Sequence, residues 1–357
     1  MHYVRLSSVR PSLVRPSGVV RSIFGITLAF GCAAALSQTS ERPELGGIWT
    51  NAALTRLTRP AGVDQLVVTP EQAQRIIANT SVAGLPAGEF EASGTEGNNA
   101  PPAAGSEDFG LRAYNDFWID PGSSLARVRG ELRSSYIIEP VNGQIPHLDT
   151  PRADFERRNF GVRYATGVGD MSGPEALPLA ERCLIGFGNT AGPGMMGTLY
   201  NSTYRFVQTD DYVVIEVEMV HDARIIPIYP DAATARANLR PAALQQWFGD
   251  SRGWYDNGQL VVETVNINPQ QMAQSAVPIT ANGKITERFS RYSDTEMVYQ
   301  FTVEDDNLYS QPWTAELSFH ASAGPMYEYA CHEGNYALPG ILAGARRLEV
   351  ENASPTE

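Results

Sequence analysis

The chain has 357 residues, of which 43% are hydrophobic and 9% aromatic, so it is long and apolar enough to bury a sizeable core. Its 32 Gly and 24 Pro favour many short elements separated by turns, which excludes a coiled coil or a chain disordered along most of its length. The 40 acidic residues outnumber the 27 basic ones and give a formal net charge of −13. Such an acidic surface repels phosphate backbones, so we expect no nucleic-acid partner.

The N-terminus has the composition of a secretory signal. Residues 1–36 contain four Arg, no acidic residue and an apolar run over residues 23–36. This run is shorter than the roughly 20 residues that span a bilayer, so we predict a signal peptide over residues 1–35, cleaved after Ala35. Cys32 offers an alternative cleavage site of the lipoprotein type, which would leave a lipid anchor. No later segment approaches transmembrane length, so we expect a periplasmic or secreted protein without a transmembrane segment.

An N-terminal extension is predicted over residues 36–110. Thr69 precedes Pro70, a pattern in which the threonine caps a short helix and the proline occupies its first position. This helix should run to about Asn79. Residues 82–108 are rich in Ala, Gly, Pro, Ser and Glu with little apolar periodicity, so we expect a flexible linker there.

Short strands dominate the chain after residue 110. Aromatic and β-branched residues predict strands over residues 114–119 and 134–139, and the turn dipeptide Asn142-Gly143 follows the second. From residue 203 onward the pattern becomes a succession of hairpins. The expected strands there cover residues 204–209, 212–221, 224–229, 254–255, 260–267, 284–292, 296–304, 313–321 and 326–332.

This pattern predicts a mainly β fold, in which an antiparallel up-and-down meander forms a lipocalin-like barrel or a strongly curled sheet, with short peripheral helices. Closure is favoured because it removes exposed strand edges. The barrel domain should cover residues 111–346, with a C-terminal tail over residues 347–357 and a helix over residues 338–350. The Gly-x-Trp string at residues 47–49 is similar to the opening of lipocalin-like barrels.

Alternation along two predicted strands suggests which side chains share a face. In residues 212–221 the odd positions are apolar and should face inward, with His221 at the end of that face. In residues 326–332 the same rule puts Tyr329 on the face opposite to His332.

Three polar clusters lie at predicted strand ends and contain candidate catalytic and binding residues. They are His221-Asp222 with Arg224, Asp250 with Arg252, and His332-Glu333. If the clusters converge at one barrel mouth, they supply a general base, a partner that orients it and a cation for an anionic group.

We assign each of these residues an expected role. His221 should act as general base and His332 as the second acid or base, while Asp222 or Glu333 orients an imidazole. Residues expected to bind substrate are Arg224, Asp250, Arg252, Trp254 and Tyr329.

Other interpretations of the same clusters remain open. Asp222, Arg224, Asp250 and Arg252 could form ion pairs that lock turns, with both histidines capping strands. A divalent metal could be held by the two histidines with one neighbouring carboxylate, but neither HExxH nor paired CxxC is present, so we expect no metal or other cofactor. Ser251 lies in a formal G-x-S-x-G match, but a hairpin follows it instead of the helix that a nucleophile elbow requires.

Aromatic residues are frequent along the meander. They are expected to fill the barrel core, and the alternative is a lumen that binds an apolar or sugar-ring ligand.

Two cysteines remain after the leader, Cys183 and Cys331. In an exported protein thiols oxidise, so we predict a disulfide between them. The alternative is a cysteine nucleophile beside His332.

Several strings resemble those of a large group of exported bacterial proteins of unestablished activity. They include His-Asp-Ala-Arg at residues 221–224, Gly-Asp-Ser-Arg-Gly at residues 249–253 and Ala-Cys-His-Glu-Gly-Asn-Tyr at residues 330–336. The resemblance covers most of residues 110–346. It implies a shared fold and supports the pairing of Cys183 with Cys331, but it implies no activity.

The residues together predict an exported, cofactor-independent hydrolase, lyase or isomerase. It should act on a small organic or sugar-like substrate by acid–base chemistry of histidine and carboxylate groups, with His221 and His332 in one site. The alternative is a periplasmic barrel that binds a small ligand without catalysis.

Overall fold

The computed structural model describes residues 42–82, 85–86, 121–149, 171, 173–186, 190–272, 275 and 277–353. All described residues belong to one compact unit, Ser40–Glu357. The predicted leader, Cys32, the strand expected at residues 114–119 and most of the expected linker lie outside the described residues.

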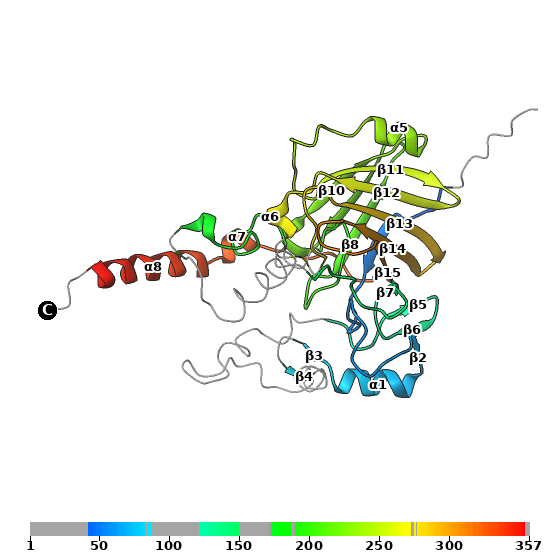
Figure 1. Cartoon of the computed structure of the whole chain (residues 1–357), viewed down its shortest axis with the longest axis horizontal. Coiled ribbons are helices and arrows are strands. Elements are labelled where there is room, and N and C mark those ends of the chain that lie inside the picture. The colour runs from blue at the N-terminus through cyan, green and yellow to red at the C-terminus, as the bar shows by residue number, and fades with distance from the viewer. Residues whose placement is uncertain are drawn as a thin grey trace, which may run out of the picture. The chain divides into compact units, whose positions relative to one another are not determined.

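The main sheet is an antiparallel meander (Figure 1), as predicted from the hairpin pattern. Its strands follow the order β10-β9-β8-β1-β15-β14-β13-β12-β11, and β7 (Ile137–Glu139) also pairs with β15. Their bounds are β1 Gly47–Thr50, β8 Thr203–Gln208, β9 Tyr212–Val217, β10 Ala223–Pro227, β11 Asp250–Asp256, β12 Gln259–Val265, β13 Lys284–Ser293, β14 Glu296–Glu304 and β15 Trp313–Ala321.

The two end strands of this order, β10 and β11, approach each other and nearly close the sheet into a barrel. Ile228, just after β10, forms a parallel bridge with Gly253 of β11. The N–H of Tyr229 donates to the carbonyl oxygen of Gly253 over 2.8 Å. The predicted barrel is therefore confirmed at the level of a nearly closed antiparallel sheet.

The turn between β11 and β12 shows how local sequence sets the register. Asp256 pairs with Gln259, so Asn257 and Gly258 are the two turn residues, with φ of 49° and 73°. Positive φ at both central positions matches the right-handed twist of a hairpin, and Asn-Gly is the dipeptide that adopts it most readily.

Inward-facing side chains fill the barrel. The largest fully buried ones are aromatic and come from five strands that are consecutive in the sheet order, β8, β1, β15, β14 and β13; they include Trp49, Tyr204, Phe206, Phe289, Tyr299, Phe301, Trp313 and Phe319. Tyr299 packs edge-to-face on Phe319, with ring centres 5.6 Å apart. Burial of each such ring stabilises the fold by about 1.5–3 kcal/mol, so the default interpretation of these aromatics as barrel core agrees with the packing.

A smaller N-terminal layer contains the predicted helix, α1 (Pro70–Ala78), and a three-stranded sheet of β2 (Val67–Val68), β5 (Arg127–Val128) and β6 (Glu131–Arg133). The hydroxyl of Thr69 accepts the N–H of Gln72, and the Gln72 side chain accepts the N–H of Thr69, which forms a capping box. The predicted helix and its cap are confirmed.

Short elements complete the structure. A two-stranded hairpin follows α1, and two short helices lie outside the meander; these are β3 (Ser81–Val82), β4 (Leu85–Pro86), α5 (Ala232–Ala237) and α6 (Pro269–Met272), with a 3₁₀ turn at Pro174–Ala176. Ala235 of α5 packs on Trp254 and Val261, so this helix covers the outer face of β11 and β12.

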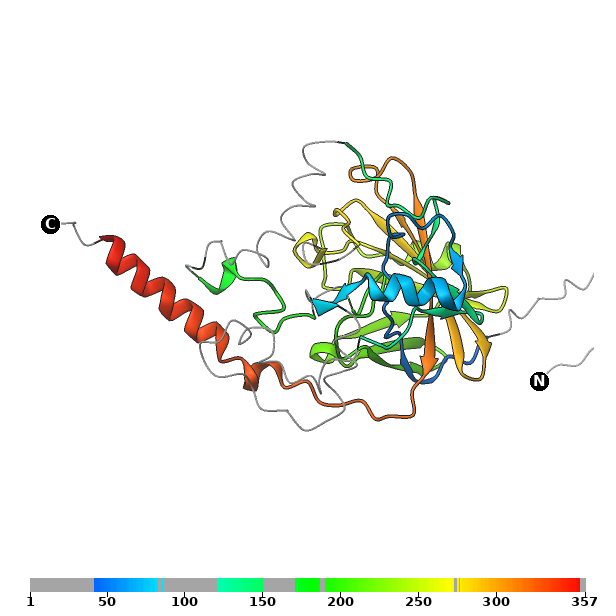
Figure 2. The ribbon, with the colours of Figure 1, turned by 90° about the horizontal axis from the view of Figure 1, so that it is seen from below.

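The strand expected over residues 326–332 is absent from this described stretch, and that prediction was wrong. Residues 325–330 have no regular secondary structure, and α7 (Cys331–Gly334) and α8 (Ala337–Ala353) follow. The reason is topological, because β15 pairs with β14 along one edge and with β1 and β7 along the other. Both edges of β15 are occupied, so a hairpin partner after it has nowhere to pair. The helix predicted over residues 338–350 corresponds to α8, which extends away from the sheet in both views (Figures 1 and 2).

Candidate functional site

A strained turn connects β9 with β10 and carries His221 and Asp222. Val220 and His221 both have left-handed backbone conformations, with φ of 58° and 55°. A β-branched residue rarely adopts this conformation, which costs about 1–3 kcal/mol per residue. The turn is closed by the N–H of Val217, which donates to the carbonyl oxygen of Asp222 over 2.8 Å.

This turn reverses the expected orientation of His221. Strand β9 ends at Val217, and Met219–His221 form a 3₁₀ turn, so the alternation of the strand does not reach the imidazole. His221 is exposed, whereas Asp222 is buried. The prediction of an inward-facing His221 was wrong because two left-handed residues reset the phase of the chain.

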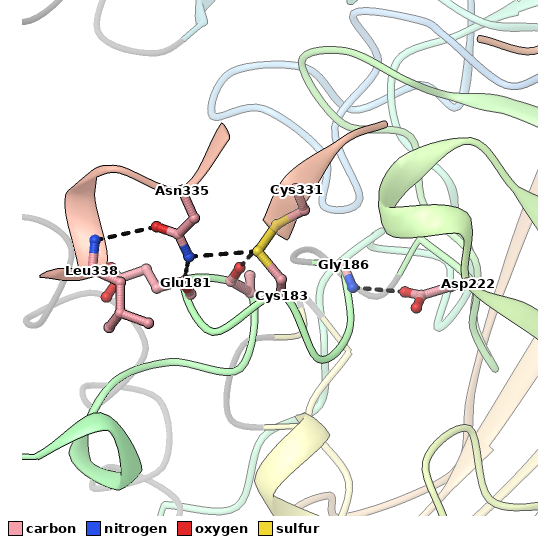
Figure 3. The surroundings of a disulfide bond; sticks show 8 residues. Glu181, Cys183, Gly186, Asp222, Cys331, Asn335 and Leu338 are labelled. Atoms are coloured by element: carbon pink, nitrogen blue, oxygen red, sulfur yellow. Dashed lines mark hydrogen bonds between the residues drawn. A yellow bond between two sulfur atoms is a disulfide. The ribbon is translucent and has the colours of Figure 1, made fainter. Parts of the chain in front are cut away.

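Asp222 is held by the backbone of a distant segment. Its Oδ2 accepts the N–H of Gly186 over 2.6 Å (Figure 3). Burial raises the pKa of Asp222 to about 7, although the bond from Gly186 acts in the opposite direction. The carboxyl group can therefore gain or lose a proton near neutral pH.

The predicted disulfide is present and lies beside this carboxylate (Figure 3). Cys183 and Cys331 are bonded, with Cα atoms 5.7 Å apart. The side chain of Asn335 donates to the carbonyl oxygen of Glu181 over 2.7 Å and accepts the N–H of Leu338 over 3.2 Å, at the start of α8. The bond holds both sulfurs in disulfide form, which excludes the alternative of a free cysteine nucleophile in this structure.

The segment before the disulfide also reaches the turn. The backbone N–H of Tyr329 donates to Nε2 of His221 over 3.2 Å, and the Tyr329 ring packs against the barrel core. His332 and Glu333 follow on α7, and both are exposed. The motif at residues 221–224 and the motif at residues 330–336 therefore come together at one end of the barrel, through Tyr329 on one side and the disulfide on the other.

Arg224, expected to bind substrate, instead points into the barrel. Its guanidinium forms a bidentate pair with Glu287 of β13, with Nη1 to Oε1 at 3.0 Å and Nη2 to Oε2 at 2.5 Å, and both side chains are at most 1% exposed. Burial alone would lower the pKa of Arg224, but the charge and the hydrogen bonds of Glu287, together with Tyr299, outweigh it and raise that pKa. The charge of Arg224 is thus paired with that of Glu287 inside the core.

Polar groups of the lumen complete this network. The Tyr299 hydroxyl donates to Oε1 of Glu287 over 2.6 Å, and it accepts the N–H of Met195 over 2.9 Å. Burial and the charge of Glu287 raise the pKa of Tyr299 well above its ordinary value. Ser251 and Thr264 share a hydrogen bond of 2.8 Å beside Arg224, so Ser251 has a structural partner.

Asp250 and Arg252 lie on the outer face of β11. Arg252 Nη1 and Asp250 Oδ1 are 2.5 Å apart, and Asp250 Oδ2 accepts the N–H of Arg240 over 2.7 Å. Arg252 also donates to the carbonyl oxygen of Asn238 over 3.1 Å. These bonds tie the loop after α5 to the sheet, in agreement with the alternative interpretation of ion pairs that lock turns.

Trp254 is also on the outer face and is buried under α5. The Arg236 guanidinium lies 5.7 Å from the centre of its ring. Alternation explains this separation, because Ser251 faces inward and so its neighbours Asp250 and Arg252, like Trp254, face outward.

The structure thus divides the expected site residues into three groups. His221, Asp222 and Tyr329 meet at one end of the barrel, with His332 and Glu333 on the adjoining helix, while Arg224 is in the core and the Asp250 group is outside. Glu287 was missed, although its position between Ile285 and Phe289 on an apolar face signals a buried carboxylate that needs a buried cation.

The part of the chain that the structure describes also contains a cavity. A cavity of about 700 Å³ lies between α1 and residues 56–65, away from the expected site residues, and Arg56 and Arg75 are among its lining residues. Over the described ranges, no three His, Cys, Asp or Glu side chains gather to hold a metal ion. No helix in the described part of the chain is long and apolar enough to cross a membrane.

Comparison of the chain with protein-family models, with curated proteins and with solved structures finds no match. The function is therefore inferred from the geometry of the chain itself.

Proposed function

We propose that the protein is an exported, cofactor-independent enzyme whose site is formed by His221 and Asp222 together with residues 329–333, here named the rim site. His221 takes a proton from the substrate, and Asp222 supplies or accepts a second proton. His332 and Glu333 contribute a further imidazole and carboxylate from α7. The expected reaction is a hydrolysis, elimination or isomerisation of a small organic or sugar-like substrate.

One observation carries this proposal: an exposed imidazole and a buried carboxyl group are adjacent in a turn with two left-handed residues. Backbone strain of this kind persists only where the surrounding structure imposes it, and it is concentrated at functional sites. Here the strained residues Val220 and His221 are followed directly by Asp222. A turn whose only role is to connect β9 with β10 could do so without placing Val220 and His221 in left-handed conformations.

The two adjacent groups differ in environment, as acid–base catalysis requires. The pKa of Asp222, raised to about 7 by burial, lies near the physiological pH, where a group transfers protons most effectively. The side chain of His221 is exposed at the surface.

The packing of the lumen favours an enzyme over a passive binding barrel. The interior contains buried aromatic rings and the Arg224–Glu287 pair, and both side chains of this pair are at most 1% exposed. A ligand in the lumen would have to displace these groups, at the cost of leaving a buried charge unpaired.

Export to an oxidising compartment is part of the proposal. The disulfide between Cys183 and Cys331 supports it, because such bonds persist mainly outside the cytosol. The Arg-rich leader and the resemblance to exported bacterial proteins at residues 221–224 and 330–336 point in the same direction.

Two assays with the purified mature chain, each run with the Cys183–Cys331 disulfide intact and after its reduction with dithiothreitol, test the proposed activity. The first measures hydrolysis of p-nitrophenyl esters and glycosides, and the second follows exchange of carbon-bound protons of hydroxy acids and uronates in D₂O by NMR. We expect turnover in one of them that falls by about 100-fold or more in His221→Gln, the range for loss of a general base. The matched control is His320→Gln on β15, which should retain the activity. Equal activity of wild type and His221→Gln, or no turnover in either assay both before and after reduction, would contradict the proposal.

A further inference from the structure

The last part of the chain forms an arm that depends on few contacts. In the C-terminal arm (residues 322–353), all of which are described, no residue is buried. The contacts of the arm with the rest of the protein include those of Ser322, which donates its N–H to the carbonyl oxygen of Ile48, and those of Tyr329, Cys331 and Asn335. Such a segment has little packing energy of its own and can separate from the barrel at low cost.

One of these contacts involves the reactive atom of the rim site. Tyr329 donates its backbone N–H to Nε2 of His221 over 3.2 Å. A ring nitrogen that accepts a hydrogen bond is unprotonated, and its lone pair is occupied by the donor. A general base uses the same lone pair to take a proton from the substrate. The arm and a substrate therefore compete for one atom.

We propose that the C-terminal arm blocks the rim site as long as the Cys183–Cys331 disulfide is intact. The amide of Tyr329 occupies the position in which a substrate presents the N–H or O–H group that His221 deprotonates. This inference rests on the proposed function, and it favours substrates that present an N–H or O–H group to His221 over those that lose a carbon-bound proton.

The Cys183–Cys331 disulfide is placed to hold the C-terminal arm against the rim site, and we call this bond the latch. Cys331 is two residues after Tyr329, and its bond to Cys183 keeps the two Cα atoms 5.7 Å apart. A tether this short gives the Tyr329 amide a high effective concentration at His221, so a substrate in solution competes poorly. On the other side, Gly186 connects the same latch to Asp222.

Opening requires a thiol reductant. A thiolate of a dithiol attacks one sulfur of the disulfide and displaces the other cysteine as a thiolate. The second thiol of the reductant then releases the attacked cysteine and closes a disulfide of its own. The protein gains two electrons and two protons, and the dithiol loses them. After this step noncovalent contacts retain the arm, among them the hydrogen bonds of Tyr329 and Asn335.

The blocking contact can be tested on the full mature chain without knowledge of the substrate. Diethyl pyrocarbonate modifies unprotonated imidazole nitrogens, and peptide mass mapping gives the rate for each histidine. Tyr329→Pro removes the donor N–H, while Tyr329→Ala keeps it and loses only the ring. We expect His221 to react about fivefold faster in Tyr329→Pro than in Tyr329→Ala, the effect of one net hydrogen bond. Tyr327→Pro, two residues earlier in the same segment, controls for the effect of proline itself.

The latch is tested by the same readout after reduction with dithiothreitol and in Cys183→Ser/Cys331→Ser. Both should raise the rate at His221 by a similar factor and leave His320 unchanged. An unchanged rate at His221 in Tyr329→Pro and in the reduced protein would overturn the inference, even if the enzyme is active. A faster rate at His221 without turnover in any assay would support the contact and reject the proposed enzyme. Turnover that does not rise when the arm is released would overturn the block.

Discussion

Gly186 donates its backbone N–H to Oδ2 of Asp222 over 2.6 Å, across a sequence separation of 36 residues. Gly186 is three residues after Cys183, whose disulfide holds Cys331. One short segment therefore connects the C-terminal arm with the turn that carries His221. Residues 183–186 therefore contact both Asp222 and the arm that contains residues 329–333, so substitutions in this segment should affect the whole rim site.

The raised pKa of Asp222 predicts a specific dependence of stability on pH. In the unfolded chain an aspartate has a pKa of about 3.9, and in the folded protein burial raises the pKa of Asp222 to about 7. Between these values the folded state binds more protons than the unfolded state, so the free energy of unfolding falls as pH rises from about 4 to 7. Above pH 7 the full penalty remains, on the order of 2–4 kcal/mol.

Asp222→Asn removes this titration. The variant should be more stable than wild type at pH 8 and of similar stability at pH 4.5, as measured by urea unfolding at each pH. Asp294→Asn, an exposed position in the β13–β14 turn, is the matched control and should follow wild type at both pH values. A difference between wild type and Asp222→Asn that does not change with pH would contradict the raised pKa.

Gly186 tests the close approach to Asp222. A Cβ atom at this position would lie 2.6 Å from Cγ of Met219 and 3.2 Å from Oδ2 of Asp222, so Gly186→Ala must displace the segment. We expect a loss of about 1–3 kcal/mol in the free energy of unfolding, typical of overpacking. Gly324→Ala is the control, since its nearest neighbour would be the Ser322 hydroxyl at 3.7 Å. Equal free energies of unfolding for the two variants would show that the segment around Gly186 can shift to accommodate a Cβ atom without loss of stability.

The buried pair of Arg224 and Glu287 should dominate the polar energetics of the core. Glu287→Gln leaves the guanidinium without its counter-charge, and loss of one partner of a buried pair costs about 3–5 kcal/mol. The exposed pair of Arg205 and Glu216 is the comparison, because Glu216→Gln should cost less than about 1 kcal/mol. Urea unfolding of both variants gives the two values. Similar losses in both would mean that Arg224 finds another partner.

Much of the barrel could be predicted from sequence because its determinants are local. Alternating apolar residues and the Asn257-Gly258 turn specify hairpins whose partners are adjacent in the chain. The capping box of Thr69 and Gln72 is equally local. The strand expected at residues 326–332 failed because the available edges of β15 depend on β1 and β7, which lie far earlier in the sequence.

The candidate site was predictable only in part. The pairing of Cys183 with Cys331 followed from their number and the expected compartment, and it brings the second histidine motif towards the first. The inward orientation of Arg224, on β10, depends on Glu287, on β13. These strands are six places apart in the sheet order, and no local pattern links the two residues. The left-handed turn at Val220 could not be predicted, because it contains neither glycine nor asparagine, the residues that most readily adopt this conformation.

The disulfide provides the last prediction, which concerns both stability and the state of the arm. Alkylation of the purified mature chain without reductant should label neither Cys183 nor Cys331, and reduction should expose both. Cys183→Ser/Cys331→Ser should lower the free energy of unfolding by about 2–4 kcal/mol, because the bond closes a loop across a sequence separation of 148 residues and restricts the unfolded chain. The same variant should be cut faster by trypsin at Arg346 and Arg347 in α8, while the cleavage rate at Arg288 within β13 stays as in wild type. Such a pattern would locate the loosening in the arm, whereas equally faster cleavage at both places would indicate that the bond holds the whole barrel together and does not act as a latch.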